Sequence, residues 1–401
     1  MVTDTSPVVD TQDDEAFRAS VREFIAANYP PGLPWHDIAF ASVEGPTVET
    51  PGMTAWRKAV GERGWGTPTW PAEYGGGGLS RQEARVLQEE MARIGARNPV
   101  GGMGVMMFGP TLIEYGSEAL KRQHLPGIIK GEVRWCQGYS EPGAGSDLAG
   151  LQTRAEDKGD HWLVNGSKIW TSGANLADRC FCLVRTDTTK KHEGISFLLI
   201  DMRTPGVETR PIRLINGTSP FCETFFTDVK VPKDQLVGPL NGGWTIAKRL
   251  LEHERQGIGA RPPGGTPDLP AMAKRYVGAD DDDRLADGDL RARISTHLMA
   301  AQAFKQTLAR TAAEAKAGAG PNAAVSILKN AGASVSQERL ELALEIMGVQ
   351  GLGWEGDLFT ETELEIVRTW LGSKAYSIYG GSQEIQNNII AKRVLGLLDH
   401  Q

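Results

Sequence analysis

The segment from Tyr139 to Gly150 holds the residues whose types and spacing best suit ligand binding. It reads Y-S-E-P-G-A-G-S-D-L-A-G, so small residues and hydroxyls are concentrated in one turn region. Backbone N–H groups can approach a ligand closely where side chains are small, and such donors suit carbonyl and phosphate groups. A glycine-rich loop taken alone is more often an ordinary turn. The loop therefore gains meaning from the features that accompany it.

A second candidate is Glu254, which lies in a helical pattern. It stands three positions after Leu251 and four before Ile258, and so shares their apolar face. The same face also holds Trp244 and Ala247. Burial on such a stripe should raise the pKa of a carboxyl group through desolvation and move it toward useful basicity. The alternative is a surface glutamate paired with Lys248 or Arg255, which is the usual arrangement on an arbitrary helix.

The elements that position these residues begin with a helical part. Residues 13–27 and 110–130 carry apolar residues at helical spacing. Ser80 and Glu83 form a capping box, which predicts a helix that ends near Ile94. We therefore predict a helical domain over residues 1–132.

The middle third is predicted to be a β-domain over residues 133–240. Asn165-Gly166 separates two apolar runs and predicts a hairpin turn, because a tight turn needs positive φ. Further strands are predicted at 180–185, 195–201, 221–226 and 229–231. Cys180 and Cys182 alternate within such a run and should share one face of a strand. No second cysteine pair or nearby histidine cluster accompanies them, so reduced cysteines are favoured over a metal site.

From Gly242 onward the helical pattern returns, which predicts a third domain over residues 241–401. Residues 261–270 are rich in Gly and Pro, and 280–283 are four consecutive aspartates. Such stretches are poorly suited to core packing, so we expect a loop and a solvated surface. The expected fold is α+β and multidomain, in the order helical, β, helical.

Composition restricts the class of protein. The 401 residues carry a formal net charge of -7, which argues against a nucleic-acid surface, since phosphate binding needs clustered Lys and Arg. No window approaches the roughly 20 apolar residues that a membrane span requires. The opening residues carry acid where a targeting peptide would carry base, so we expect a cytoplasmic protein.

Several ordered segments together resemble the acyl-CoA dehydrogenase family. The loop S-E-P-G-A-G-S-D-L-A-G, followed by N-G-S-K-I-W-T-S, is similar to the family's flavin-binding signature. The similarity extends to P-A-E-Y-G-G at 71–76 and to I-Y-G-G-S-Q-E-I-Q at 378–386. It implies two helical domains around a β-domain, with a four-helix bundle at the C-terminal end. FAD is then expected between the β-domain and that bundle, as the cofactor of acyl-CoA oxidation in lipid metabolism.

The resemblance also implies roles for individual residues. Those expected to contact the flavin are Gln137, Tyr139, Ser140, Gly145, Ser146, Trp170, Thr171, Ser172 and Ser382. Those expected to contact the acyl-CoA are Ser146, Leu251, Glu252, Arg255 and Tyr379. For Trp170 the alternative is a core tryptophan that ends a hairpin. For Glu252 and Arg255 the alternative is a plain salt bridge.

The catalytic base is expected at Glu254. Many family members carry a glutamate after the tyrosine of the closing motif, but here Tyr379 is followed by Gly380. The segment L-E-H-E-R, which ends at Arg255, resembles the branch of the family whose base comes from this helix. Gly380 can still offer its backbone N–H to the thioester oxygen. The lost side chain at 380 favours branched or bulky acyl groups.

Two departures from the family concern contacts with a neighbour's FAD. The family's Arg-x-x-Phe-Gly segment is reduced to Lys274-Arg-Tyr-Val277-Gly278, and Glu345 stands where glutamine is usual. Acid beside a pyrophosphate would be repulsive. The chain resembles the larger subunits of heteromeric acyl-CoA dehydrogenases, so a heterotetramer with a smaller homologue is expected, with a homo-oligomer as the alternative. An electron-transfer flavoprotein is the expected acceptor.

Two other functions remain open from the sequence. Fold does not settle function, so a flavin oxidase or monooxygenase on the same fold is one alternative. A flavin-poor subunit that supports an active partner is the other. The flavin content of the purified protein separates the two.

Overall fold

The computed structural model describes residues 12–30, 50–258, 267–316 and 324–397. The chain divides into two compact units. The first unit comprises the residues up to Ile212 together with Ser219–Gly257, and the second comprises Arg213–Thr218 and the residues from Ile258 onward.

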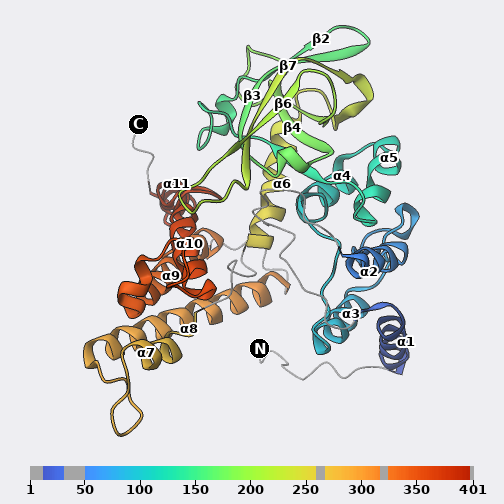
Figure 1. Cartoon of the computed structure of the whole chain (residues 1–401). Helices are drawn as coiled ribbons and strands as arrows, with labels where there is room; N and C mark the ends of the chain where they lie inside the picture. The colour runs from blue at the N-terminus through green and yellow to red at the C-terminus, as the bar shows by residue number, and fades with distance from the viewer. Residues whose placement is uncertain (1–11, 31–49, 259–266, 317–323, 398–401) are drawn as a thin grey trace. The chain divides into compact units, whose positions relative to one another are not determined.

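The first unit begins with helices, as the sequence predicts. They are α1 Gln12–Asn28, α2 Pro51–Glu62, α3 Arg81–Arg93, α4 Gly109–Tyr115 and α5 Glu118–Ile129 (Figure 1). The capping box is confirmed, because Ser80 Oγ accepts from Glu83 N and the Glu83 carboxylate accepts from Ser80 N. The single helix expected over 110–130 is instead two helices, because the chain becomes extended at Gly116 and Ser117 caps a new start.

Within the described residues, eight strands form one sheet. They are β1 Trp135–Gly138, β2 Arg154–Asp157, β3 His161–Ser172, β4 Arg179–Arg185, β5 Ile195–Asp201, β6 Val207–Ile212, β7 Phe221–Pro232 and β8 Leu236–Val237. The strand order is β6-β7-β3-β2-β4-β5-β8, with β1 paired to β4 in parallel. The expected order of a helical part followed by a β-part is thus confirmed.

The predicted hairpin at Asn165-Gly166 is wrong. Both residues lie inside the continuous strand β3, where the register against β7 shifts between Val164 and Gly166. Asn165 accepts from Asp228 N and donates to the Asp228 carboxylate, which anchors it to the neighbouring strand. The Asn-Gly pair therefore forms a bulge, another feature in which positive φ and close backbone approach favour glycine.

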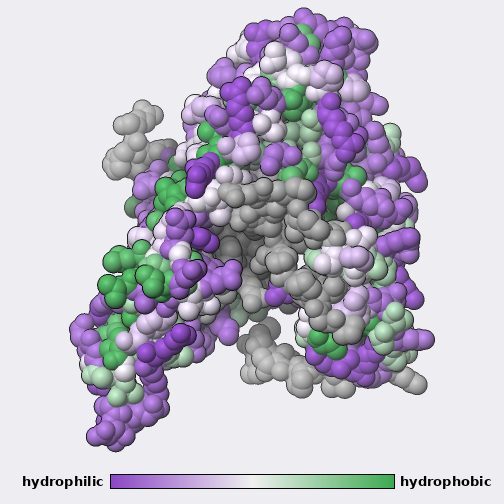
Figure 2. Space-filling view, in the orientation of Figure 1, coloured by the Kyte–Doolittle hydropathy of each residue, from purple (hydrophilic) through white to green (hydrophobic). Residues whose placement is uncertain are grey.

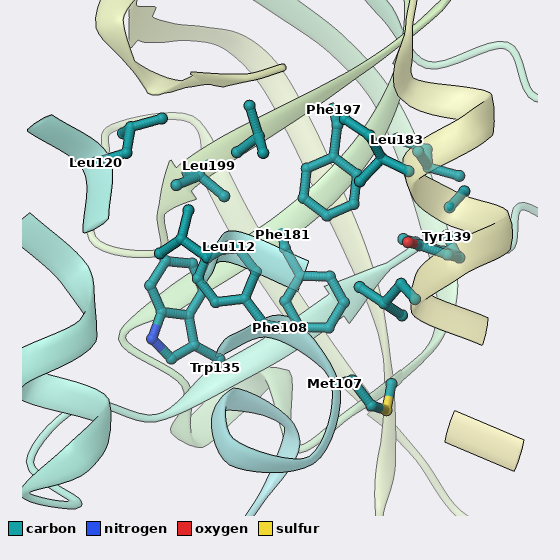
Figure 3. Close-up of a cluster of buried hydrophobic side chains, with 14 of the residues drawn as sticks. Met107, Phe108, Leu112, Leu120, Trp135, Tyr139, Phe181, Leu183, Phe197 and Leu199 are labelled. Carbon is teal, nitrogen blue, oxygen red and sulfur yellow. The ribbon is translucent and has the colours of Figure 1, made fainter. Parts of the chain in front are cut away.

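The core of the first unit joins its helices to the sheet. The rings of Phe108, Phe181 and Phe197 stack, and centroids of neighbouring rings lie 5.4 and 6.1 Å apart (Figure 3). The side chains of β4 alternate between the two faces of the sheet. Phe181 and Leu183 belong to this cluster, whereas Cys180 and Cys182 belong to a second cluster on the opposite face. The prediction that the two cysteines share one face is confirmed.

Helix α6, Gly243–Ile258, packs on the same core. Among its described side chains, Ile246, Ala247 and Leu250 are fully buried, while Trp244 and Leu251 pack at the edge of the cluster. The buried face is therefore rotated toward Leu250 from the face that the sequence predicts. Tyr139 belongs to the same cluster, so the loop that follows β1 and helix α6 share one core.

The second unit is helical. Its helices are α7 Leu269–Tyr276, α8 Gly288–Lys316, α9 Ala324–Met347, α10 Glu361–Ser373 and α11 Gln383–Ile389. Helix α9 contacts α7, α8, α10 and α11, so it is the centre of the unit. Residues 280–283, between α7 and α8, are exposed, as expected of the acidic run. Most of the predicted loop at 261–270 lies outside the described residues.

Candidate functional site

The loop after β1 lies directly on the sheet. A Cβ built on Gly138 would stand 2.9 Å from Cys180 Sγ and 3.0 Å from Cys182 Sγ, so a larger residue would push β1 away from β4. Tyr139 is buried and meets the rings of Phe181 and Phe197 edge-on at 6.1 and 6.4 Å (Figure 3). Because its ring belongs to the core, Tyr139 can contact a surface ligand through its backbone.

The loop is closed by its own backbone and joined to β3. Glu141 and Ala144 exchange two N–H···O bonds of 3.0 Å, which close a turn around Pro142-Gly143. Ile169 N donates to Ser140 O at 2.8 Å. Gln137 and Ser140 are half-buried, and Gly145 and Ser146 are exposed. The two predicted flavin segments, residues 137–146 and 170–172, are thus connected by the bond at Ile169.

A buried ion pair reinforces this connection. Lys168 is fully buried and Glu141 is 7% exposed, with 2.8 Å between Lys168 Nζ and Glu141 Oε1. Gln152 N and Thr153 N also donate to the Glu141 carboxylate, at 2.6 and 2.9 Å. Burial alone would raise the pKa of Glu141, but the charge of Lys168 and the donated hydrogen bonds outweigh burial and lower the pKa.

Sequence reasoning did not single out Glu141 or Lys168. A signal was present, because Lys168 has the same parity in β3 as the buried Trp162 and Val164. A lysine at a buried strand position needs a partner, since burying an unpaired charge is costly. Nothing in the sequence pattern identifies that partner, which lies 27 residues away.

Strand β3 presents an exposed tryptophan just beyond the ion pair. Trp170 has φ of 60° and is 52% exposed, at a register shift between Lys168 and Thr171. Positive φ is strained for a bulky residue, and such strain concentrates at functional sites. The ring of Phe221 meets the indole edge-on at 6.1 Å. The bulge therefore aims a large flat ring outward, which suits stacking against a planar ligand.

The residues after Trp170 differ in orientation. Thr171 is fully buried, and its Oγ1 has no hydrogen-bond partner among the described residues. In this conformation Thr171 can contact a ligand through its backbone, whereas the half-buried Ser172 retains some exposure. An exposed indole beside half-buried hydroxyl residues and backbone N–H groups fits the face and polar edge of an isoalloxazine ring.

Helix α6 carries Leu251, Glu252 and Arg255, three of the expected substrate contacts. Leu251 is partly buried against the core. Glu252 is exposed and pairs with Arg249 at 2.8 Å, and Arg249 also holds Glu114 at 2.9 Å. The salt-bridge alternative for Glu252 is therefore realised, and its contact with substrate stays a prediction.

The expected base lies at the end of the described part of α6. Glu254 and Arg255 belong to the helix, but their side chains lie outside the described residues. His253, which sequence reasoning did not consider, is half-buried, and its Nε2 has no partner among the described residues. Burial and then the charge of Arg249 lower the pKa of His253, so a neutral imidazole precedes Glu254 at neutral pH.

The closing motif belongs to the second unit. Gly380 and Gly381 have φ of 66° and 88°, a region that glycine adopts without strain. Gln386 Nε2 donates to Gly380 O at 3.0 Å, and Ser382 caps α11 by accepting from Ile385 N. The Tyr379 ring is 45% exposed. The backbone at 380 is therefore held in a form that suits glycine, as the sequence has it.

The described ranges contain neither a cluster of metal ligands nor a membrane-spanning helix. No three His, Cys, Asp or Glu side chains there come together in an arrangement that could hold a metal ion. None of the helices in those ranges is both long and apolar enough to cross a membrane.

Three family models match the chain in order. They describe the N-terminal domain of acyl-CoA dehydrogenases at residues 11–132, the middle domain at 136–229 and the C-terminal domain at 241–395. The acyl-CoA dehydrogenase IpdE1 of Mycobacterium tuberculosis is 38% identical over 400 residues, which cover 96% of this chain and 98% of that protein.

Solved structures show the same likeness. The steroid acyl-CoA dehydrogenase Tcur3481-Tcur3483 is 29% identical, with a TM-score of 0.76, over 98% of this chain and 100% of that one. The ChsE4-ChsE5 complex of Mycobacterium tuberculosis is 27% identical, with a TM-score of 0.71, over 98% and 100%. Both of these similar structures are named as pairs of proteins.

Proposed function

Since the chain belongs to the acyl-CoA dehydrogenase family, we propose that it oxidises an acyl-CoA thioester to the trans-2-enoyl-CoA with the help of FAD. The observation that carries the proposal is the joining of the two signature segments. Ser140 and Ile169 share a hydrogen bond, and the strained bulge beside it holds Trp170 52% exposed. When bound, FAD supplies the acceptor for the hydride that leaves the β-carbon.

The base of the reaction is proposed to be Glu254. It removes the proton from the α-carbon, so that one proton and one hydride leave the substrate as the double bond forms. Its place in α6 supports this role, because Glu254 follows the buried Leu250 by one helical turn. The preceding His253 is held neutral, so it does not add a charge that would stabilise the carboxylate and weaken its basicity.

The thioester oxygen is proposed to accept from the backbone N–H of Gly380. Charge develops on this oxygen as the α-proton leaves, so a fixed donor lowers the barrier. The Gln386 side chain, which binds Gly380 O, steadies the neighbouring peptide. A glutamate at 380 would also have to adopt φ of 66°, which is strained for a residue with a Cβ.

The substrate is proposed to carry a branched or bulky acyl group. The absence of a side chain at 380 leaves space near the acyl chain, and a similar solved structure is a steroid acyl-CoA dehydrogenase. Leu251, Arg255 and Tyr379 are proposed to contact the acyl-CoA, together with Ser146. An electron-transfer flavoprotein is the proposed electron acceptor, and the cytoplasm the proposed location.

The assembly is proposed to be a heterotetramer with a smaller homologous subunit. Similar structures are named as protein pairs. The Glu345 carboxylate accepts two hydrogen bonds from Arg293 within the second unit. Unlike the glutamine that is usual at this position, it has no N–H to donate to a neighbour's cofactor. Val349, Leu352 and Leu358 are 78%, 80% and 86% exposed. Figure 2 shows apolar residues on the visible surface of the second unit. Such a patch suits an apolar partner surface.

An anaerobic titration of the purified protein tests the activity. Straight-chain, branched and steroid-derived acyl-CoAs are added in turn while flavin absorbance is followed. The proposal is supported if branched and steroid-derived acyl-CoAs bleach the flavin absorbance and straight-chain acyl-CoAs bleach it only slightly. Bound flavin that no acyl-CoA bleaches would favour an oxidase or monooxygenase. If flavin is missing even after co-expression with the smaller homologue, the proposal fails and a supporting subunit is favoured.

A further inference from the structure

The Glu141–Lys168 ion pair ties together three segments that meet under the signature loop. Lys168 belongs to β3, Glu141 to the loop after β1, and the two N–H donors at 152 and 153 to the chain before β2. Lys168 Nζ also donates to Tyr139 O at 3.1 Å. One fully buried ammonium group therefore holds both a side chain and a main-chain carbonyl of the same loop.

This contact fixes the orientation of a peptide group. In a planar trans peptide the C=O and the following N–H point in opposite directions. Because Lys168 holds the Tyr139 carbonyl on the buried side, the N–H of Ser140 points away from Lys168. The next peptide is fixed as well, since Ile169 N donates to Ser140 O. Contacts with β3 therefore fix the orientation of two successive peptide groups in the loop.

Stability alone does not account for such a pair. A buried ion pair is often no more stabilising than apolar residues of the same volume, since desolvation offsets the attraction. A methionine at 168 would fill similar space in a strand whose other buried residues include Trp162 and Val164. What an apolar residue cannot do is donate to Tyr139 O and compensate Glu141. The pair is therefore best explained by what it orients.

We propose that Lys168 and Glu141 are positioning residues, which turn the Ser140 N–H toward the flavin and hold β3 in register at the Trp170 bulge. The inference rests on the proposed function, because the ligand is the flavin of that function. Neither residue touches the ligand. Lys168 acts through the Tyr139–Ser140 peptide, and it stands two residues before the exposed indole.

Three variants test the pair: Lys168→Met, Glu141→Gln and the double variant. Lys168→Met leaves Glu141 buried and uncompensated, so we expect weaker FAD binding, by at least about tenfold, and a lower flavin reduction potential. The double variant removes both charges, so thermal stability should largely return. Its potential should stay low, because Tyr139 O still lacks its donor.

An exposed ion pair that reaches the same loop provides a matched control. Lys191 pairs with Asp147 at 2.9 Å, but both side chains are more than half exposed. Lys191→Met should leave FAD affinity and reduction potential unchanged. If Lys168→Met is too unstable to purify, the double variant decides, since a wild-type potential in it would overturn the proposal.

Hydrogen exchange separates this inference from the proposed function. In the flavin-free chain, Lys168→Met should speed exchange at the amides of Ile169, Glu141 and Ala144. Unchanged exchange there would overturn the positioning role, whether or not the protein binds FAD. If the wild-type chain lacks flavin even after co-expression with the smaller homologue, while Lys168→Met still exchanges faster at these amides, the proposed function fails and the role of the pair in ordering the loop stands.

Discussion

At the scale of a single side chain, Glu254 carries the proposed proton abstraction. Glu254→Gln keeps the size and hydrogen-bonding capacity of the residue and removes its basicity. We expect kcat to fall by about 10²–10⁴-fold, the usual contribution of a general base, with FAD content unchanged. Flavin reduction measured in a single turnover with acyl-CoA checks this step directly.

The matching control is Glu62→Gln, because Glu62 is exposed on α2 and makes only a long ion pair of 3.8 Å with the exposed Lys58 among the described residues. It should keep wild-type turnover. Near-normal flavin reduction in Glu254→Gln would remove the residue from its role, and the base would then have to be sought in another residue of α6 or in the closing motif.

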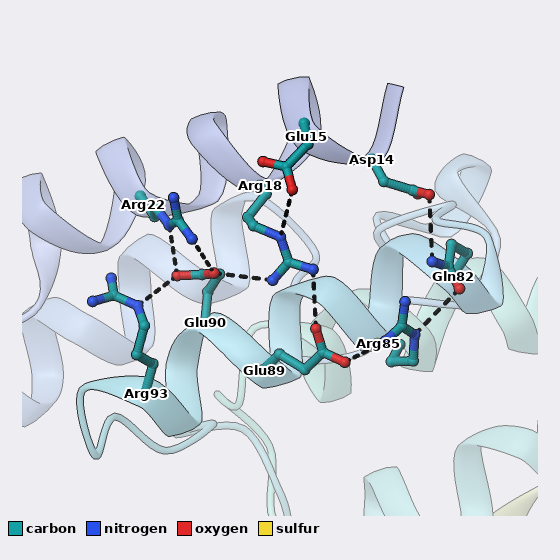
Figure 4. A network of polar contacts seen from close by, with 9 residues as sticks. All are labelled: Asp14, Glu15, Arg18, Arg22, Gln82, Arg85, Glu89, Glu90 and Arg93. Carbon is teal, nitrogen blue, oxygen red and sulfur yellow. Dashed lines mark hydrogen bonds and ion pairs between the residues drawn. The ribbon is translucent and has the colours of Figure 1, made fainter. Parts of the chain in front are cut away.

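At the scale of elements, Glu90 joins α1 to α3. Its carboxylate is buried among Arg18, Arg22 and Arg93, at 2.8 to 3.0 Å (Figure 4). The hydrogen bond from Arg22 is the largest cause that lowers its pKa from 4.5 to about 2. A lowered carboxyl pKa stabilises the fold above pH 4.5, and this contribution is lost as the pH falls toward 2.

Glu90→Gln should therefore cost about 2–3 kcal/mol of unfolding free energy at pH 7. The difference from wild type should shrink between pH 4.5 and 3, as measured by urea denaturation at each pH. Glu89→Gln is the control, because its side chain is 40% exposed and its pairs are more solvated. An equal loss of unfolding free energy in both variants, or a loss that does not change with pH, would contradict the stabilising role of the Glu90 carboxylate.

The bulge at Asn165-Gly166 in β3 gives a second prediction at the scale of elements. A Cβ on Gly166 would lie 2.6 Å from Thr153 Cα, and φ there is 149°. Gly166→Ala should destabilise the first unit by about 1–3 kcal/mol, since backbone must shift to admit it. Gly101→Ala is the control, because its Cβ would meet nothing within 4 Å. The thermal unfolding midpoints of the two variants are compared, and equal midpoints would contradict the close approach of Gly166 to Thr153.

The bulge at Asn165-Gly166 also shows what could not be predicted from the sequence. Local signals, such as the capping box at Ser80 and the alternation in β4, gave the correct structure because their causes lie within a few residues. The Asn165-Gly166 signal failed because positive φ serves a turn and a bulge alike, and the partner strand decides between them. Alternation from the buried Lys168 would bury Trp170 and expose Thr171, but the register shift between Lys168 and Thr171 reverses both exposures.

At the scale of the molecule, the prediction concerns assembly. The exposed patch of Val349, Leu352 and Leu358 lies in the connection between α9 and α10, and all three are at least 78% exposed. If the smaller homologue covers this patch, Leu352→Glu should weaken association strongly without unfolding the second unit, because a charge in a buried interface loses its hydration. Light scattering after size-exclusion chromatography of the co-expressed chains measures the mass of the complex.

The control for this experiment changes charge without entering the patch. Glu361→Lys alters an exposed residue in the first turn of α10 and should leave the heterotetramer intact. Wild-type chain expressed alone should be a smaller species with less than one FAD per chain, and co-expression should restore both mass and flavin. A stable tetramer of this chain alone with full flavin occupancy would show instead that the copies complete each other's sites, and the homo-oligomer would replace the heteromer.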